Sequence, residues 1–217
     1  MKFTHFILAE LMSIIQQATY NANDLSIDSR EPLYQGFIQL ERVQLRHRLF
    51  NQNNYSPLIQ RELIKRKQAA GVLIYDDQQQ KFALIEQFRI GAMDDAESPW
   101  QLEIIAGVLD GDESPETCIQ RESIEESGCE IELLEHLFTF YPSAGACNEI
   151  FHLYSAQANL PNEGGIFGMP EEGENIKLHI IEYHLLDDLL QNKRLRNAPI
   201  IMALQWLKQH IAKLQNG

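Results

Sequence analysis

Residues 107–129, GVLDGDESPETCIQRESIEESGC, decide the fold of this 217-residue chain. The start of a helix is indicated by Ser114, Pro115 and Glu116, which supply a capping hydroxyl, a proline for the first helical position and an acid for the first turn. We expect the helix to end at Gly128, because glycine commonly follows the last helical turn. The segment therefore predicts a loop, a helix and a second loop.

Three acidic residues share one face of this predicted helix. Glu122, Glu125 and Glu126 stand at positions i, i+3 and i+4, so their like charges repel unless a cation lies among them. Magnesium is the natural candidate, since it takes oxygen ligands and bridges carboxylates to phosphates. Glu113 and Arg121 could pair and tie the loop to the helix. Taken alone, the glutamates also fit a charged surface helix.

The wider spacing resembles the Nudix signature, in which Gly, Glu, Arg-Glu, Glu-Glu and Gly recur at fixed intervals. All seven defined positions are present, and their chance occurrence in such a chain is roughly one in a million. Ser123 departs from the pattern, which usually has a small apolar residue there. The resemblance favours a Nudix fold over a plain surface helix. It implies an α/β (α+β) architecture with a mixed sheet in an α/β/α sandwich.

Residue matching to that signature implies roles for the acidic residues. Glu122 and Glu126 would bind Mg²⁺ directly, with Mn²⁺ as an alternative ion, and Ala106 would bind through its backbone carbonyl. Glu125 would act in catalysis as a ligand or as a group supporting the ligands. Such metals polarise a phosphoryl oxygen and activate a water. Supporting structural roles fall to Gly107, Glu113, Arg121 and Gly128.

The flanks of the motif resemble bacterial ADP-ribose pyrophosphatases over residues from about 33 to 210. The segments that carry this likeness are RHRLF at 46–50, RELIKR at 61–66, LIEQFRI at 84–90, ESPWQLEIIAG at 97–107 and NAPIIMALQWL at 197–207. The likeness implies hydrolysis of a nucleoside diphosphate sugar, ADP-ribose, to AMP and ribose 5-phosphate. It also implies a homodimer that exchanges an N-terminal β subdomain, residues 1–68, beside a catalytic domain, residues 69–217.

Several substrate contacts follow from the same resemblance. Arg89 would contact the diphosphate, Arg61 would lie near the nucleoside, and Phe37 would stack on the base from the other subunit. For the two arginines the competing interpretation is a surface ion pair, and for Phe37 it is a core side chain. Glu149 is a further candidate for substrate binding, and Glu103 is a weaker candidate for substrate or metal.

Residues 160–175 form a stretch rich in Gly, Pro and Glu that is too polar to be core and has the character of a functional loop. The resemblance places the catalytic glutamate at Glu172, and Glu174 as a second acid that touches metal. A mobile loop could bring in a general base only when substrate is bound. The competing interpretation is a disordered acidic loop.

One departure leaves the substrate open. ADP-ribose enzymes carry Ser-Pro-Gly after the motif, whereas this chain reads YPSAG at 141–145, so that Pro142 is displaced. The related sugar-nucleotide pyrophosphatases share this architecture, and GVLDGDESPETCI resembles their sequence too, so GDP-mannose or another sugar nucleotide is the alternative substrate. A second alternative is a non-catalytic Nudix domain that senses a nucleotide, although such a domain should have lost motif glutamates or gained a DNA-binding domain.

Alternating and β-branched stretches predict the remaining elements. We expect a terminal amphipathic helix over 199–214 with Ile201, Leu204, Leu207 and Ile211 on its apolar face. We expect strands within 33–50, 58–67, 69–75, 81–88, 100–106, 133–141, 150–156 and 176–186.

The composition limits the classes of partner that the protein can bind. With 18 Lys+Arg against 31 Asp+Glu, the formal charge of −13 leaves no broad basic surface for nucleic acid or an anionic membrane. Cys118, Cys129 and Cys147 are odd in number and lack metal-ligand spacing, which indicates reduced thiols in a cytoplasmic protein. Met12 is an alternative start that would leave residues 1–11 outside the native chain.

Overall fold

The computed structural model describes residues 17–50 and 53–216, except for the side chains of Glu172 and Asn216. The chain forms two compact units, Met1–Arg66 with Gly145–Asn148, and Lys67–Ala144 with Glu149–Gly217. The expectation that residues 1–68 are exchanged between subunits stays a prediction. The question of an internal start at Met12 lies outside the described residues.

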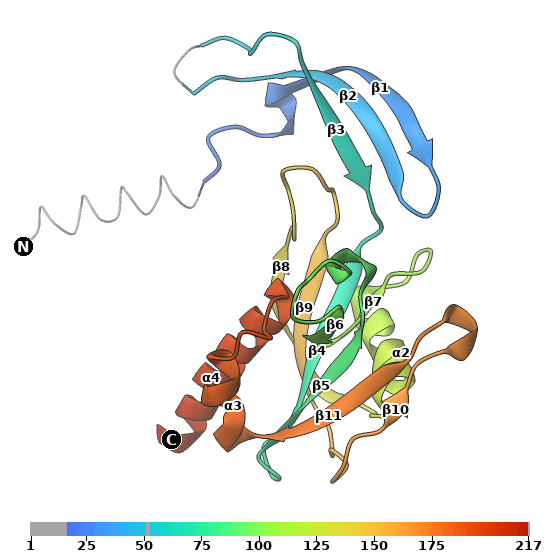
Figure 1. The fold of residues 1–217 in the computed structure, drawn as a ribbon. Coiled ribbons are helices and arrows are strands. Elements are labelled where there is room, and N and C mark those ends of the chain that lie inside the picture. Colours follow the sequence, from blue (N-terminus) through green and yellow to red (C-terminus); the bar gives the residue numbers. More distant parts are fainter. Residues whose placement is uncertain (1–16, 51–52, 217) are drawn as a thin grey trace, which may run out of the picture. The chain divides into compact units, whose positions relative to one another are not determined.

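The first unit contains a three-stranded antiparallel sheet in the order β1-β2-β3 (Figure 1). Strand β1 begins earlier than the sequence predicts, at Leu25, and almost all of it is exposed. Strand β3 ends against the 145–148 segment: the Ile64 N–H donates to Ala146 O at 2.8 Å, and the Asn148 N–H donates to Ile64 O at 3.2 Å. The elements of this unit are η1 (Ala22–Asp24), β1 (Leu25–Gln35), β2 (Gln39–His47) and β3 (Ile59–Lys65).

The second unit is built on an eight-stranded sheet in the order β10-β11-β5-β4-β9-β8, with β6 paired to β5 and β7 paired to β4. Strands β4 and β9 are parallel and the other pairs are antiparallel, so the sheet is mixed. The strands of this unit are β4 (Ala69–Asp76), β5 (Lys81–Phe88), β6 (Trp100–Glu103), β7 (Ile105–Val108), β8 (Glu132–Phe140), β9 (Phe151–Gln157), β10 (Ile166–Phe167) and β11 (Ile176–Glu182). Its helical elements are η2 (Ile90–Ala92), α2 (Pro115–Ser127), η3 (Pro170–Glu172), η4 (Tyr183–Leu185), α3 (Leu186–Leu190) and α4 (Ala198–Asn216).

Helices cover both faces of this sheet, which gives the α/β/α sandwich (Figure 1). Cys118 and Ile119 of α2 join the core on one face, and Leu204 and Leu207 of α4 join the core on the other. Strand β4 lies between these two cores, so all of its residues are buried.

Four details differ from the expectations. The stretch 100–106 is two short strands that break at Ile104, and the strand expected over 176–186 ends at Glu182. Leu204 and Leu207 are buried as expected, but Ile201 is 37% exposed and its neighbour Ile200 takes the buried place instead. Leu160 is only 3% exposed, so the polar loop begins with a core residue. Among the described residues, no helix is long and apolar enough to span a membrane.

Candidate active site

Helix α2 forms as its sequence predicts. Ser114 is the N-cap, and its Oγ accepts from the Thr117 N–H at 3.2 Å. Gly128 closes the helix in the left-handed conformation with φ 67°. The departure at Ser123 is accommodated because its buried hydroxyl donates to Ile119 O at 2.7 Å. A polar residue therefore fits here without an unsatisfied group.

Arg121 gathers the acids of the motif around one guanidinium. The expected pairing with Glu113 is present through two contacts, each of 3.2 Å, and Glu113 also accepts from the Asp110 N–H at 3.1 Å. Nη1 of Arg121 bonds Glu122 at 2.8 Å and Glu125 at 2.9 Å. Hydrogen bonding to Arg121 lowers the pKa of Glu113. The arginine thus ties the loop to the acidic face of the helix.

Glu126 is the most buried acid of that face, at 2% exposure. Its Oε2 accepts from the Ala106 N–H at 3.0 Å, and Gln87 of β5 lies 3.5 Å from Oε1. Burial raises the pKa of Glu126 to about 8, with a further rise from the charge of Glu122, while the Ala106 bond opposes the shift. A cation beside this carboxyl would stabilise its charged form.

Glu122 packs directly over Gly107, at the end of strand β7. A Cβ at position 107 would lie 1.7 Å from Glu122 Oε1, so only glycine leaves room for this carboxylate. Burial raises the pKa of Glu122, and the charges of Glu125 and Glu174 add to the rise while Arg121 opposes it. The glycine of the motif is therefore explained by the space that the glutamate needs.

Arg89 follows β5 and binds Glu103, with Nε and Nη2 at 2.9 and 2.7 Å from Glu103 Oε2. The ion pair joins a buried to an exposed group, since Glu103 is only 6% exposed whereas the Arg89 side chain is 43% exposed. Asn197 bonds the other carboxylate oxygen at 2.8 Å. Burial acts to lower the pKa of Arg89, but the charges of Glu103, Glu126 and Glu174 outweigh it and raise this pKa.

The acidic loop lies at the end of helix α2. The Gly168 N–H donates to Glu125 O at 3.3 Å, and the Glu174 carboxylate accepts from the Met169 N–H at 3.2 Å. The charge of Glu174 acts on Glu122, Glu126 and Arg89. The backbone of Glu172 belongs to η3, while its side chain lies outside the described part of the structure.

The other predicted substrate residues are less defined. Phe37 is 98% exposed, so its interpretation as a core side chain is wrong. Arg61 is exposed on β3 and donates to Gln60 O at 2.8 Å. Glu149 is partly buried just before β9. The roles of these residues toward a substrate stay predictions.

The structure brings Glu122, Glu126, Glu174, Ala106 and Arg89 into one electrostatic neighbourhood. Among the side chains that the structure describes, which do not include that of Glu172, no group of three or more His, Cys, Asp or Glu is arranged to hold a metal ion. Their oxygens are engaged by Arg121 and by backbone N–H groups instead.

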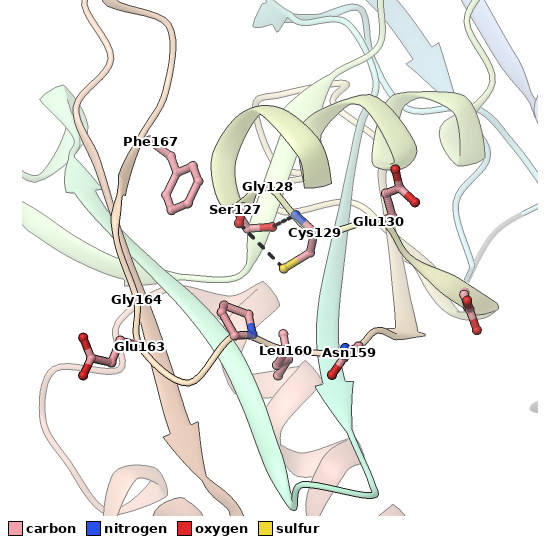
Figure 2. A pocket seen from close by; sticks show the side chains of 11 residues that line it. Ser127, Gly128, Cys129, Glu130, Asn159, Leu160, Glu163, Gly164 and Phe167 are labelled. Carbon is pink, nitrogen blue, oxygen red and sulfur yellow. Dashed lines mark hydrogen bonds between the residues drawn. The ribbon is translucent and has the colours of Figure 1, made fainter.

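A separate pocket of about 580 Å³ opens beyond the C-terminal end of α2 (Figure 2). Figure 2 shows Cys129 beside Ser127, which accepts from the Cys129 N–H at 3.3 Å through its Oγ. Phe167 and Glu163 lie on the opposite chain segment. Among the described residues, none of the predicted metal or phosphate ligands lines this pocket, so it is not the candidate site.

Sequence reasoning missed Asn197 as part of the site and treated Glu103 as a possible ligand. Their contact joins residues that are 94 positions apart, and no local pattern signals it. The acids of the motif were identified because their spacing along one helix is a local signal.

Comparison with known proteins places this geometry in a family. The NUDIX domain model matches residues 65–204. The chain is 35% identical to an ADP-ribose pyrophosphatase of Escherichia coli, over 91% of this chain and 94% of the relative. It is 35% identical to an ADP-ribose pyrophosphatase of Haemophilus influenzae, over 95% of each chain.

Two further similarities are more distant. A GDP-mannose pyrophosphatase of Yersinia pestis is 33% identical over 69% of this chain and 75% of the relative. A crystal structure of an ADP compounds hydrolase superposes with a TM-score of 0.67 at 19% identity, covering 90% of this chain and 98% of that chain, which supports the fold. With the complete motif at 107–129 and a domain match over most of the chain, the protein is a member of the Nudix hydrolase family.

Proposed function

We propose that the protein hydrolyses the pyrophosphate bond of ADP-ribose to AMP and ribose 5-phosphate. The observation that carries the proposal is the acidic face of α2, where Glu122 and buried Glu126 lie within electrostatic reach of Glu174, and Glu126 lies within reach of Arg89 as well. A face of carboxylates next to an arginine suits a diphosphate that arrives with a divalent cation. The relatives named ADP-ribose pyrophosphatase, which match over at least 91% of this chain, support the choice of substrate.

The donor set fits magnesium. Carboxylate oxygens of Glu122, Glu126 and Glu174, together with the carbonyl of Ala106, are hard ligands of the kind that Mg²⁺ prefers, and Mn²⁺ is an alternative ion. When bound, the metal would polarise a phosphoryl oxygen and activate a water. Arg121 already places one positive charge among Glu113, Glu122 and Glu125, which indicates that this face accommodates cationic partners.

The remaining residues serve the reaction through binding and proton transfer. Arg89 offers a guanidinium to the diphosphate. Glu172 acts as the general base that accepts the proton of the attacking water, and the loop that carries it is linked to α2 through Gly168. Glu125, which is hydrogen-bonded to Arg121, acts as a metal ligand or supports the residues that bind the metal.

The proposal includes a cytoplasmic homodimer whose N-terminal units are exchanged. In that arrangement Phe37 of one subunit would stack on the adenine held by the other, and Arg61 would lie near the nucleoside. Phe37 is 98% exposed, so its ring is accessible to a second subunit or to a ligand. This exposure favours an intermolecular role. Glu149 is retained as a further substrate contact.

GDP-mannose is the second candidate substrate. The 33% identity to a GDP-mannose pyrophosphatase favours it, and the displaced Pro142 in YPSAG counts against ADP-ribose. A nucleotide sensor without activity is disfavoured, because every acid of the motif is present.

A substrate panel decides between these functions. The purified protein is incubated with Mg²⁺ and ADP-ribose, GDP-mannose or other nucleoside diphosphate sugars, and the products are separated. We expect ADP-ribose to have the highest kcat/KM, and a much higher value for GDP-mannose would refute that assignment. Absence of turnover with every substrate would favour the sensor.

The role of Glu172 has its own test. Glu172→Gln should lower kcat by about 10² to 10⁴, the usual contribution of a general base. Glu171→Gln, which changes an exposed neighbour on the same loop, is the matched control. A fall of less than tenfold for Glu172→Gln would remove it from this role.

A further inference from the structure

The guanidinium of Arg89 is held by a carboxylate that is itself held from the start of the last helix. Glu103 uses one oxygen, Oε2, for both contacts with Arg89, at 2.9 and 2.7 Å. Its second oxygen, Oε1, accepts a hydrogen bond from Asn197 Nδ2 at 2.8 Å. Asn197 directly precedes α4, so a chain of contacts runs from this helix through Glu103 to Arg89.

Because Glu103 is buried, both of its carboxylate oxygens need hydrogen-bond partners. Glu103 is 6% exposed, and a buried carboxylate is costly unless both oxygens find partners. Arg89 satisfies one oxygen and Asn197 satisfies the other. Loss of the Asn197 bond would leave Glu103 Oε1 without this donor and free the carboxylate to rotate, which would carry the guanidinium with it.

The backbone of Arg89 adds to this constraint. Its N–H donates to Pro99 O at 2.9 Å, and its carbonyl accepts from the Ala92 N–H at 2.9 Å. Only the side chain remains to be oriented, and Glu103 engages its Nε and Nη2. Its Nη1 takes no part in the contacts with Glu103, and the side chain is 43% exposed. This edge of the guanidinium is left for an anionic partner.

We propose that Asn197 is a positioning residue for the pyrophosphate reaction, fixing the Glu103 carboxylate so that Arg89 presents its guanidinium to the substrate diphosphate. The inference rests on the proposed function of the site. Asn197 acts through Glu103 and has no substrate contact of its own. The role predicts a specific effect on substrate binding.

Asn197→Asp, assayed at about pH 9 so that the two carboxyl groups do not share a proton, is the decisive change, because it sets a second carboxylate 2.8 Å from that of Glu103 and the like charges repel. We expect KM for ADP-ribose to rise about tenfold while kcat changes by less than about threefold, the pattern of lost uniform binding. Gln205→Glu adds the same charge to the exposed face of α4 and serves as the matched control with unchanged KM.

The double variant Glu103→Gln with Asn197→Asp reverses the hydrogen bond. A glutamine amide would donate to the new aspartate, while its carbonyl oxygen still accepts from Arg89. We expect KM to return to within about threefold of the wild-type value. The proposal would be overturned if KM stays high in the double variant and the melting temperatures of the single and double variants are lowered equally. That result would indicate a purely structural role.

A second measurement does not depend on turnover. The Arg89 Nε–H is bonded to Glu103, so its exchange with water, followed by ¹⁵N NMR of the whole protein, reports whether the guanidinium is held. Asn197→Asp should speed this exchange at least about tenfold, and the double variant should restore it. Unchanged exchange in Asn197→Asp would overturn the proposal. If the wild type fails to hydrolyse any sugar nucleotide, the proposed function fails, while this exchange measurement still decides whether Asn197 positions Arg89.

Discussion

Replacing Gly107 with alanine tests whether Glu122 acts from the place where the structure holds it. The added Cβ would lie 1.7 Å from Glu122 Oε1, 2.1 Å from Cδ and 2.5 Å from Cγ. Ordinary contacts begin at 3.4 Å, so the carboxylate oxygen has to move by about 1.7 Å. Because all three atoms belong to a flexible side chain, the glutamate will move and strand β7 will stay in place.

The expected loss of activity follows from that displacement. A misplacement of about 1 Å can lower a rate about 10²-fold, so we expect kcat/KM to fall at least about 10²-fold, equivalent to about 2.7 kcal/mol of transition-state stabilisation. Stability should change far less. The Arg121–Glu122 contact that is lost joins partly exposed groups and contributes at most about 1 kcal/mol. A large catalytic effect with a small stability effect is therefore the signature.

The assay compares steady-state hydrolysis of ADP-ribose with urea unfolding for the wild type and Gly107→Ala. Gly91→Ala is the control, because a Cβ there meets nothing within 4 Å. Activity of Gly107→Ala within threefold of the wild type would refute the reasoning about Glu122. A loss of unfolding free energy above about 3 kcal/mol would show instead that the strand, and not the side chain, absorbs the clash.

Three further predictions concern other parts of the chain. Mg²⁺ at 100 times its Kd should raise the unfolding free energy of the wild type by about 2.7 kcal/mol in a thermal shift assay, and an equal rise in Glu126→Gln would exclude Glu126 as a ligand. Burial acts to raise the pKa of Asp76, but its hydrogen bonds, led by that from the Gln79 N–H, outweigh this effect and lower the pKa. The ionised carboxylate therefore stabilises the fold above about pH 4, and this stabilisation is lost as the pH falls through the pKa of Asp76 in the folded protein. Asp76→Asn should therefore lower the unfolding free energy by about 1 to 3 kcal/mol at pH 7 and flatten its fall below pH 4 in urea titrations, and equal acid sensitivity in both proteins would count against Asp76. Phe37→Ala should raise KM for ADP-ribose about tenfold through lost base stacking while unfolding changes by less than about 0.5 kcal/mol, and an unchanged KM would end the stacking proposal.

Local chemistry made the central helix and most strands predictable. Ser114 and Gly128 mark the two ends of α2 through capping preferences that depend only on neighbouring residues. The buried strand β4 was evident from its β-branched content. The acids of α2 could be assigned to one face because helical spacing fixes it.

The elements that were missed lack such a local signal. The start of β1, LSIDSREP, alternates apolar and polar residues only as far as Asp28 and is exposed along its length, so the pattern is too short to reveal the strand. Short apolar runs such as 100–106 do not show where a strand breaks, and the break at Ile104 comes from pairing with two different partners, β5 and β4. The bond between Asn197 and Glu103 depends on the tertiary fold alone.

The segment Gly145–Asn148, which completes the N-terminal unit from the middle of the chain, constrains the order in which the protein can fold. The Arg66 N–H donates to the Asn148 side chain across 82 positions, so a ribosome must synthesise well past the N-terminal strands before they can gain this partner. The parallel pairing of Ala69 with Phe151 in the second unit brings the two ends of that long loop together. The N-terminal unit therefore cannot be completed before residue 148 has been synthesised, and residues 1–66 expressed alone would lack part of their own fold.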